Sequence, residues 1–133
     1  MIPIAAAVPS GPVDILMGIG GAPEGVLAAA ALRTLGGEFQ GRLCFRDDKE
    51  RERAIAMGIT DPERVFGTED LASGDVIFAA TGVTDGDFLQ GVRFHAGGAS
   101  SHSVVMRAAS GTIRYVTAQH DFSRGFGMPR MPW

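Results

Sequence analysis

Cysteine is nearly absent from this sequence. The 133 residues contain a single one, Cys44, so the chain forms no internal disulfide and has no cysteine cluster for a zinc site. This excludes the small secreted domains that disulfides hold together. We therefore expect a reducing, cytoplasmic setting. We interpret Cys44 as a half-buried strand thiol rather than a nucleophile, because no histidine lies near it in sequence.

Long apolar runs and a basic cluster are also lacking. No apolar stretch reaches the roughly 18 residues that a membrane-spanning helix needs, and residues 1–12 lack the basic start of a signal peptide. The net charge is −3, and the five arginines after residue 92 are widely spaced. Nucleic-acid binding requires a clustered basic patch, so we do not expect a nucleic acid as partner. Because no long apolar run is present, we do not expect a membrane as partner either.

Glycine, in contrast, is abundant, and four of the 19 glycines fall between residues 18 and 25. The apolar run at 13–17 precedes them and predicts a buried strand. Pro23 and Glu24 follow, and both residue types suit the first turn of a helix. A strand, a glycine loop and a helix N-terminus together form a ready site for an anion.

Glu24 leaves two interpretations of this loop open. A carboxylate beside a bound phosphate is favourable when a divalent cation lies between them, which predicts a metal-bridged site. Alternatively, the helix dipole alone favours a glutamate there, and the glycines only connect a strand to a helix. The spacing matches neither GxGxxG nor GxxxxGK[ST], so it indicates neither dinucleotide nor Walker-type binding.

Strand and helix patterns alternate through the first two-thirds of the chain. The expected elements are a helix at 23–35, a strand at 38–46, a helix at 48–57 capped by Asp47, a helical turn at 68–72, a strand at 76–80 buried on both faces, and a short helix at 84–91. This order predicts an α/β layered sandwich with a largely parallel central sheet. In such a sheet the loops at 18–24 and 81–85 end neighbouring strands and face one crevice.

The last third has a different pattern. Alternating apolar residues at 92–96, and at 103–109 and 112–118 around Ser110-Gly111, predict antiparallel strands and a β-hairpin. Three histidines lie in or beside these strands without metal-binding spacing, so we interpret them as core or surface residues: His95, His102 and His120. Asp85 and Asp87 are interpreted as loop and capping residues rather than metal ligands.

Two features suggest that the chain is part of a larger unit. Within the helix at 23–35 only Glu24, Arg33 and Thr34 are polar, so this helix needs cover on more than one side. Residues 2–8 are apolar and rich in alanine, which predicts the end of a helix whose beginning is not in the sequence. The residues from 121 to 133 are rich in Gly, Pro and Met, and we expect a flexible tail there.

Three segments together resemble a known family. They are GIGGAPEGVLAAAALRTLGGEFQGRL from Gly18, DVIFAATGVTDGDFLQGVRF from Asp75, and HSVVMRAASGTIRYV from His102. In this order and spacing they resemble the class II fructose-1,6-bisphosphatases, including the bifunctional sedoheptulose-1,7-bisphosphatases. The resemblance runs from about residue 2 to residue 120.

This resemblance implies a fold and an activity. The fold would be the C-terminal half of the lithium-sensitive phosphatase fold, with residues 1–120 as that half. The activity would be metal-dependent hydrolysis of the 1-phosphate of fructose 1,6-bisphosphate, or of sedoheptulose 1,7-bisphosphate, in gluconeogenesis or the Calvin cycle. Mn²⁺ or Mg²⁺ would be the cofactor, Glu24 a metal ligand and Gly21 a backbone contact to substrate. No catalytic base is assigned.

The sequence also departs from the family. Family members are more than twice as long, and their other metal carboxylates belong to an N-terminal half that is missing here. We therefore expect the intact enzyme to need that half, and the isolated chain to be weakly active or inactive. We also expect the intact enzyme to be a homo-oligomer. Two alternatives remain: a non-catalytic sugar-phosphate-binding module, and a structural α/β domain.

Overall fold

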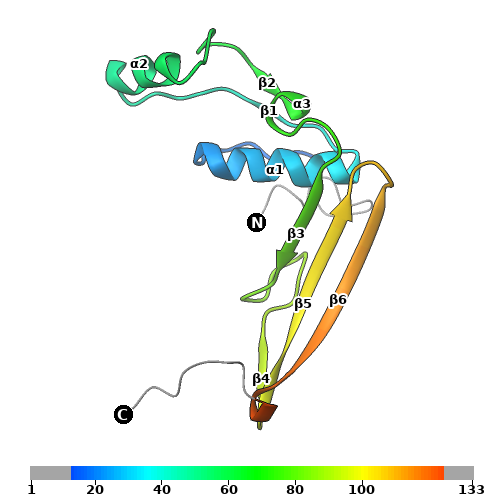
Figure 1. Cartoon of the computed structure of the whole chain (residues 1–133). Helices are drawn as coiled ribbons and strands as arrows, with labels where there is room; N and C mark the ends of the chain where they lie inside the picture. The colour runs from blue at the N-terminus through cyan, green and yellow to red at the C-terminus, as the bar shows by residue number, and fades with distance from the viewer. Residues whose placement is uncertain (1–12, 125–133) are drawn as a thin grey trace, which may run out of the picture.

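The computed structural model describes residues 13–124 (Figure 1). Its elements are α1 (Ala22–Leu35), β1 (Gln40–Gly41), α2 (Asp48–Ala56), β2 (Phe66–Gly67), α3 (Thr68–Leu71), β3 (Ile77–Thr81), β4 (Arg93–His95), β5 (Gly98–Arg107), β6 (Thr112–Asp121) and the 3₁₀ helix η2 (Phe122–Arg124). The helix end expected at 2–8 lies outside the described residues, as do residues 125–133 of the tail expected at 121–133. The start of that expected tail is wrong, because Asp121 belongs to β6 and residues 122–124 form η2.

The main sheet is antiparallel throughout. β5 pairs with β6 along its whole length, from Gly98↔Asp121 to Arg107↔Thr112. β3 and β4 pair with the two ends of β5 along its other edge. The α/β class is confirmed, but the largely parallel central sheet is wrong for the described residues. That prediction needed strands from 13–17 and 38–46 beside β3, and neither segment joins this sheet.

The two segments that were expected to be strands of this sheet, 13–17 and 38–46, have different structures. Residues 13–17 form no strand, and most of their apolar side chains are exposed instead of buried. Within 38–46 only β1 forms, paired with β2 in a two-residue ladder. Cys44 lies outside it and is exposed, so its assignment as a half-buried strand thiol is wrong.

The two longer helices form where the sequence indicates. α1 ends at Leu35, and its C-cap Gly36 has a φ of 75°, in the left-handed region that favours glycine. α2 begins after Asp47, whose Oδ1 accepts a hydrogen bond of 2.9 Å from the Glu50 N–H. The turn α3 also forms, although Gly67 rather than Thr68 is its N-cap. The helix expected at 84–91 is wrong, because bends and irregular backbone occupy this segment.

The core lies between α1 and one face of the sheet. Ala31 of α1 packs with Phe78, Val104 and Met106, which alternate along β3 and β5 as the two-residue period of strands requires. The opposite face of β3 is exposed at Ile77 and Ala79, so the expectation of a strand buried on both faces is wrong. α1 likewise exposes Val26 and Leu27. Its apolar composition predicts that it is covered on more than one side, but the described residues cover only one side.

The molecule is open. In Figure 1 the sheet extends away from α1, and at the far ends of β5 and β6, beside β4, lies only the short 3₁₀ helix η2 and no α-helix of the described residues. Among the described helices, none is long and apolar enough to cross a membrane.

Candidate functional site

The first turn of α1 presents the residues that the sequence singles out. Gly21 is the N-cap, in extended conformation with φ −69° and ψ 152°, and Ala22 and Pro23 follow as the first helical residues. The carbonyl of Gly21 accepts the first helical hydrogen bond from the Gly25 N–H at 3.0 Å. Pro23 has no N–H to leave unsatisfied, which explains why proline fits here.

Gly21 and Glu24 are in direct proximity. The Glu24 carboxylate folds back over the N-cap: a Cβ added to Gly21 would lie 2.2 Å from Glu24 Oε2. The side chain is exposed, and within residues 13–124 it has no hydrogen bond or ion pair. It is therefore neither buried in the core nor paired with an arginine, and both oxygens are available to a ligand.

The backbone beside this carboxylate offers hydrogen-bond donors. The N–H groups of Ala22 and Glu24 belong to the first turn, where no preceding helical carbonyl accepts them. Within the described range no other acceptor takes their place. The positive end of the helix dipole adds to their attraction for anions. One carboxylate and these donors suit a cation and an anion bound side by side.

A complete metal site is not formed by these residues alone. Among residues 13–124, no group of three or more His, Cys, Asp or Glu side chains converges as metal ligands would. Mg²⁺ and Mn²⁺ take six oxygen-rich ligands and are held weakly by a single carboxylate. Glu24 could therefore supply only one ligand to such an ion, and the other ligands would be water, substrate or residues outside this part of the chain.

The loop at 81–85 makes its own contacts. Thr81 Oγ1 lies 2.8 Å from Ser103 Oγ, and Asp85 Oδ1 accepts hydrogen bonds from the Gly91 N–H at 3.0 Å and from Arg93 Nη2 at 2.9 Å. The Gly91 hydrogen bond and the Arg93 charge hold the pKa of Asp85 below its usual range. Its loop role is confirmed, whereas the capping role expected for Asp85 and Asp87 is wrong, because no helix forms at 84–91.

A shared crevice between this loop and residues 18–24 stays a prediction. Its basis was a pair of parallel strands ending at one edge, and the described sheet has no parallel pair.

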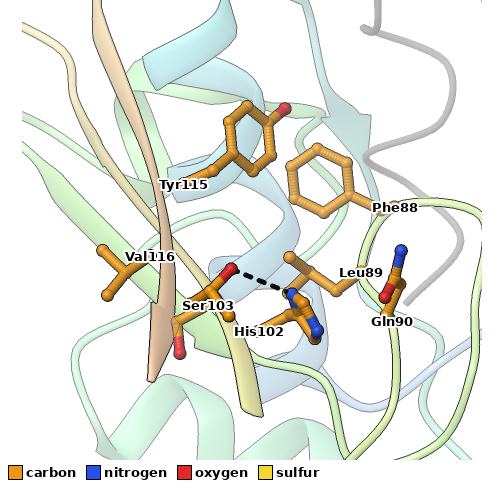
Figure 2. Close-up of a pocket in the computed structure, with 8 residues that line it drawn as sticks. Phe88, Leu89, Gln90, His102, Ser103, Tyr115 and Val116 are labelled. Atoms are coloured by element: carbon orange, nitrogen blue, oxygen red, sulfur yellow. Dashed lines mark hydrogen bonds between the residues drawn. The ribbon is translucent and has the colours of Figure 1, made fainter. Parts of the chain in front are cut away.

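A separate cavity of about 160 Å³ opens beside the hairpin (Figure 2). It is lined by Phe88, Leu89, Gln90, His102, Ser103, Tyr115, Val116 and Thr117. The rings of Phe88 and Tyr115 are 6.3 Å apart, and His102 Nδ1 lies 3.3 Å from Thr117 Oγ1. No Asp, Glu, Lys or Arg lines the cavity, and it includes no residue of 18–24. Sequence reasoning missed it, because only folding brings the loop at 88–90 to β5 and β6.

The histidines are surface or half-buried residues, as expected. His95 is exposed, and His120 Nε2 lies 2.8 Å from Ser101 Oγ across the β5–β6 pair. Neither belongs to a metal-binding group of the described residues.

Comparison with known proteins gives the family. The sequence model of the family described as "Bacterial fructose-1,6-bisphosphatase, glpX-encoded" matches residues 1–120. The chain is 48% identical over 125 residues to the "D-fructose 1,6-bisphosphatase class 2/sedoheptulose 1,7-bisphosphatase" of Microcystis aeruginosa (strain NIES-843 / IAM M-2473), covering 84% of this chain and 36% of that protein. It is 46% identical over 121 residues to the proteins of the same name from Synechococcus sp. strains JA-3-3Ab and JA-2-3B'a(2-13), covering 81% of this chain and 35% of each relative.

The chain thus spans about a third of the length of these curated relatives. The family match, in contrast, covers nearly all of the chain. The chain belongs to the glpX-type, class II family of bacterial fructose-1,6-bisphosphatases.

Proposed function

We propose that this chain is the portion of a class II fructose-1,6-bisphosphatase that supplies one metal ligand and one substrate contact. The reaction is hydrolysis of the 1-phosphate of fructose 1,6-bisphosphate, with sedoheptulose 1,7-bisphosphate as a second substrate. Its setting is the cytoplasm, in gluconeogenesis or the Calvin cycle. The observation that carries the proposal is the unpaired Glu24 carboxylate, folded over Gly21 among free N–H donors.

Each residue has a separate task in this proposal. Glu24 contributes a carboxylate oxygen to a divalent cation, Mn²⁺ or Mg²⁺. Gly21 keeps the space beside that carboxylate open and lets the substrate approach the backbone, because it has no Cβ. The first-turn N–H groups orient a phosphate oxygen. A bound divalent cation would supply Lewis-acid polarisation of the phosphate and an activated water.

The remaining ligands come, in this proposal, from the two-thirds of the relatives' length that the chain does not span. The described residues agree with this division, because Glu24 is not part of a converging ligand group there. The intact enzyme is proposed to be a homo-oligomer, and the chain by itself to be weakly active or inactive.

A chimeric enzyme tests the proposal. This chain replaces the matching third of the Microcystis aeruginosa relative, and phosphate release from fructose 1,6-bisphosphate is measured with Mn²⁺. The intact relative is the positive control, and the chain alone is the negative control. We expect activity in the chimera, loss of that activity in its Glu24→Gln variant, and little or none in the chain alone.

Other outcomes separate the alternatives. If the chimera is active and Glu24→Gln leaves its turnover and Mn²⁺ dependence unchanged, Glu24 is not part of the site. Binding of a sugar phosphate to the chain alone, retained with EDTA and in Glu24→Gln, favours a non-catalytic binding module. A folded chimera without activity or ligand response leaves a structural role for this chain.

A further inference from the structure

The cavity beside the hairpin has the size of a single ring. Its volume of about 160 Å³ is close to the roughly 150 Å³ of an engineered protein cavity that binds benzene. The cavity lies between the loop at 88–90 and strands β5 and β6, and no residue of the first turn of α1 lines it. It is therefore a separate place for a small molecule, of about the size of one six-membered ring with a small substituent.

Two aromatic rings form part of the lining. The centroids of the Phe88 and Tyr115 rings are 6.3 Å apart, and their planes are inclined at 60°. Figure 2 shows the two rings next to each other at one side of the cavity. Tyr115 is 67% exposed, so much of its ring is open to a ligand. A flat aromatic molecule can stack on such a ring, and this contact adds to the gain from burial.

Two polar side chains complement the rings. Gln90 and His102 line the cavity, and in Figure 2 they lie below the two rings. His102 Nδ1 lies 3.3 Å from Thr117 Oγ1, whereas Nε2 has no hydrogen bond among residues 13–124. The Gln90 amide has no hydrogen bond within that range either. An amide presents a donor beside an acceptor, so its best partner is a second group of the same kind.

Charged side chains are absent from the lining. Among the described residues no Asp, Glu, Lys or Arg contributes to it. A charged ligand would lose hydration there without gaining an opposite charge. An uncharged ligand loses less, and its polar edge regains hydrogen bonds from Gln90 and His102. The lining therefore disfavours phosphates, which the first turn of α1 favours.

From these observations we infer that the cavity is a binding site for an uncharged planar ring that carries an amide-type donor and acceptor. The ring stacks on Tyr115, and its amide edge bonds to Gln90 and His102. A ligand in this position contacts the loop at 88–90 and the hairpin together, so it fastens the loop to the sheet. The inference does not depend on the proposed function, because the two sites share no residue.

Nicotinamide is the probe for this site, because it is an uncharged pyridine ring with one carboxamide. Its binding to the chain is measured by NMR, from the backbone amides and the ring protons of Tyr115 and His102. We expect saturable shifts centred on the lining residues. The dissociation constant should be on the order of 1 mM, since so small a ligand makes few contacts.

Two analogues of the probe are matched controls. Nicotinate keeps the ring but carries a charged carboxylate, whereas cyclohexanecarboxamide keeps the amide but loses the flat aromatic ring. Each should bind at least about tenfold more weakly than nicotinamide, the first because of its charge and the second because it cannot stack.

Variants of the lining separate this site from general binding to exposed side chains. Tyr115→Leu removes the stacking ring and Gln90→Leu removes the amide, and each should weaken nicotinamide binding by about tenfold. Phe94→Leu and Gln119→Leu are the controls, because Phe94 and Gln119 are exposed and do not line the cavity. They should leave the dissociation constant unchanged. Amide spectra of the free variants check the fold, and Tyr115→Phe, which keeps the ring, should bind like the parent.

The outcomes decide the inference separately from the proposed function. Saturable binding with the expected order of probes, in the chain and in the chimera, supports it. Absence of saturable shifts, equal binding of nicotinamide and nicotinate, or equal effects of Gln90→Leu and Gln119→Leu overturns it. Binding that disappears in the chimera also overturns it, because the rest of the enzyme then covers the cavity. Glu24→Gln should leave nicotinamide binding unchanged, whatever it does to phosphatase activity.

Discussion

At the scale of single residues, Glu24 and Gly21 act as one unit. The helical turn brings residue 24 back over residue 21, and the absence of a Cβ at Gly21 gives the carboxylate its place. The carboxylate also interacts favourably with the helix N-terminus, so it is compatible with the fold before any ligand binds. Ligand binding therefore requires no other contact of Glu24 to be broken among the described residues.

Glu24→Gln tests the charge at nearly constant shape. In the active chimera we expect turnover to fall by about a hundredfold or more, since a neutral amide is a poor ligand for a hard cation. The Mn²⁺ concentration for half-maximal rate should rise as well. Glu52→Gln on the exposed face of α2 is the control, because Glu52 is also exposed and without a described partner. It should leave both quantities unchanged.

Gly21→Ala tests the coupling of the two residues. The new Cβ would overlap Glu24 Oε2, and because that oxygen ends a flexible side chain, the carboxylate moves while the helix stays. We expect Mn²⁺ dependence in the chimera to shift toward that of Glu24→Ala, with an unchanged urea midpoint. Gly18→Ala is the control, since no other atom lies within 4 Å of a Cβ added at Gly18. If Gly21→Ala still alters Mn²⁺ dependence in a Glu24→Ala background, it does not act through Glu24.

At the scale of elements, the packing of α1 on β3 and β5 holds the site in place. Small alanines on α1 let the helix approach the sheet, where Met106 and Val104 are fully buried. Thr34 is also buried, and its hydroxyl donates a 2.6 Å hydrogen bond to the Ala31 carbonyl. The helix therefore positions its first turn through contacts made in its second half.

Met106→Ala should weaken this packing strongly. Removing a buried methionine side chain costs about 2–5 kcal/mol, through lost burial and the cavity that remains. The urea midpoint of the chain should fall accordingly, or the chain should unfold in buffer. Met57→Ala, at a highly exposed position, should change stability by less than about 0.5 kcal/mol. Equal midpoints for the two variants would contradict the described core.

Asp75 fastens the β5–β6 hairpin to the start of β3. Its carboxylate accepts hydrogen bonds from Arg107 Nε at 3.0 Å and from the Ala109 N–H at 3.2 Å. The Arg107 hydrogen bond, helped by the Ala109 N–H, holds the pKa of Asp75 below its usual range. Because the folded-state pKa is depressed, the stabilisation is fully present above the unfolded pKa of about 3.9 and is lost as pH falls through the lower folded value.

The pH dependence of Asp75→Asn follows from this sign. The variant should have a lower urea midpoint than the parent between pH 6 and 8, by a constant amount, and the difference should shrink below about pH 4. The effect should be small, since this ion pair is solvent-exposed. Asp87→Asn, exposed and without a described partner, should leave the urea midpoint between pH 6 and 8 close to that of the parent. A difference that grows on acidification would be inconsistent with this assignment.

At the scale of the whole molecule, the described chain is a small core with a large exposed surface. One helix covers one face of a four-stranded sheet, and the rest of the sheet extends beyond it. A domain that buries little apolar surface has a small free energy of unfolding. Its stability should therefore depend on whatever binds the folded form.

Metal should stabilise the chimera but not the isolated chain. A ligand stabilises only the folded state that binds it, in proportion to the logarithm of its concentration over Kd. With Glu24 as one ligand, millimolar Mn²⁺ should leave the melting temperature of the chain alone unchanged. In the chimera Mn²⁺ should raise it by several degrees, and EDTA should reverse the increase. A rise in the chain alone that Glu24→Gln abolishes would show that the chain holds a metal by itself.

Much of the local structure could be read from the sequence. The limits of α1, the Asp47 cap, the Gly36 C-cap and the hairpin follow from nearest-neighbour chemistry, which acts within a few residues. The position of Glu24 in the first turn of α1 follows in the same way. Residues 13–17 and 38–46 were mispredicted because an apolar or alternating run shows that a segment suits a strand, but not that a partner strand is present.

The sequence by itself determined the family, the helix that carries Glu24, and the closeness of Glu24 to Gly21, because each of these depends on residues adjacent in the chain or on an extended match. Only the tertiary structure decided the antiparallel order of the sheet, the face of α1 that is buried, the cavity beside His102 and the exposure of Ile15, Met17 and Ile19. These depend on contacts between residues far apart in the chain, which local chemistry does not specify.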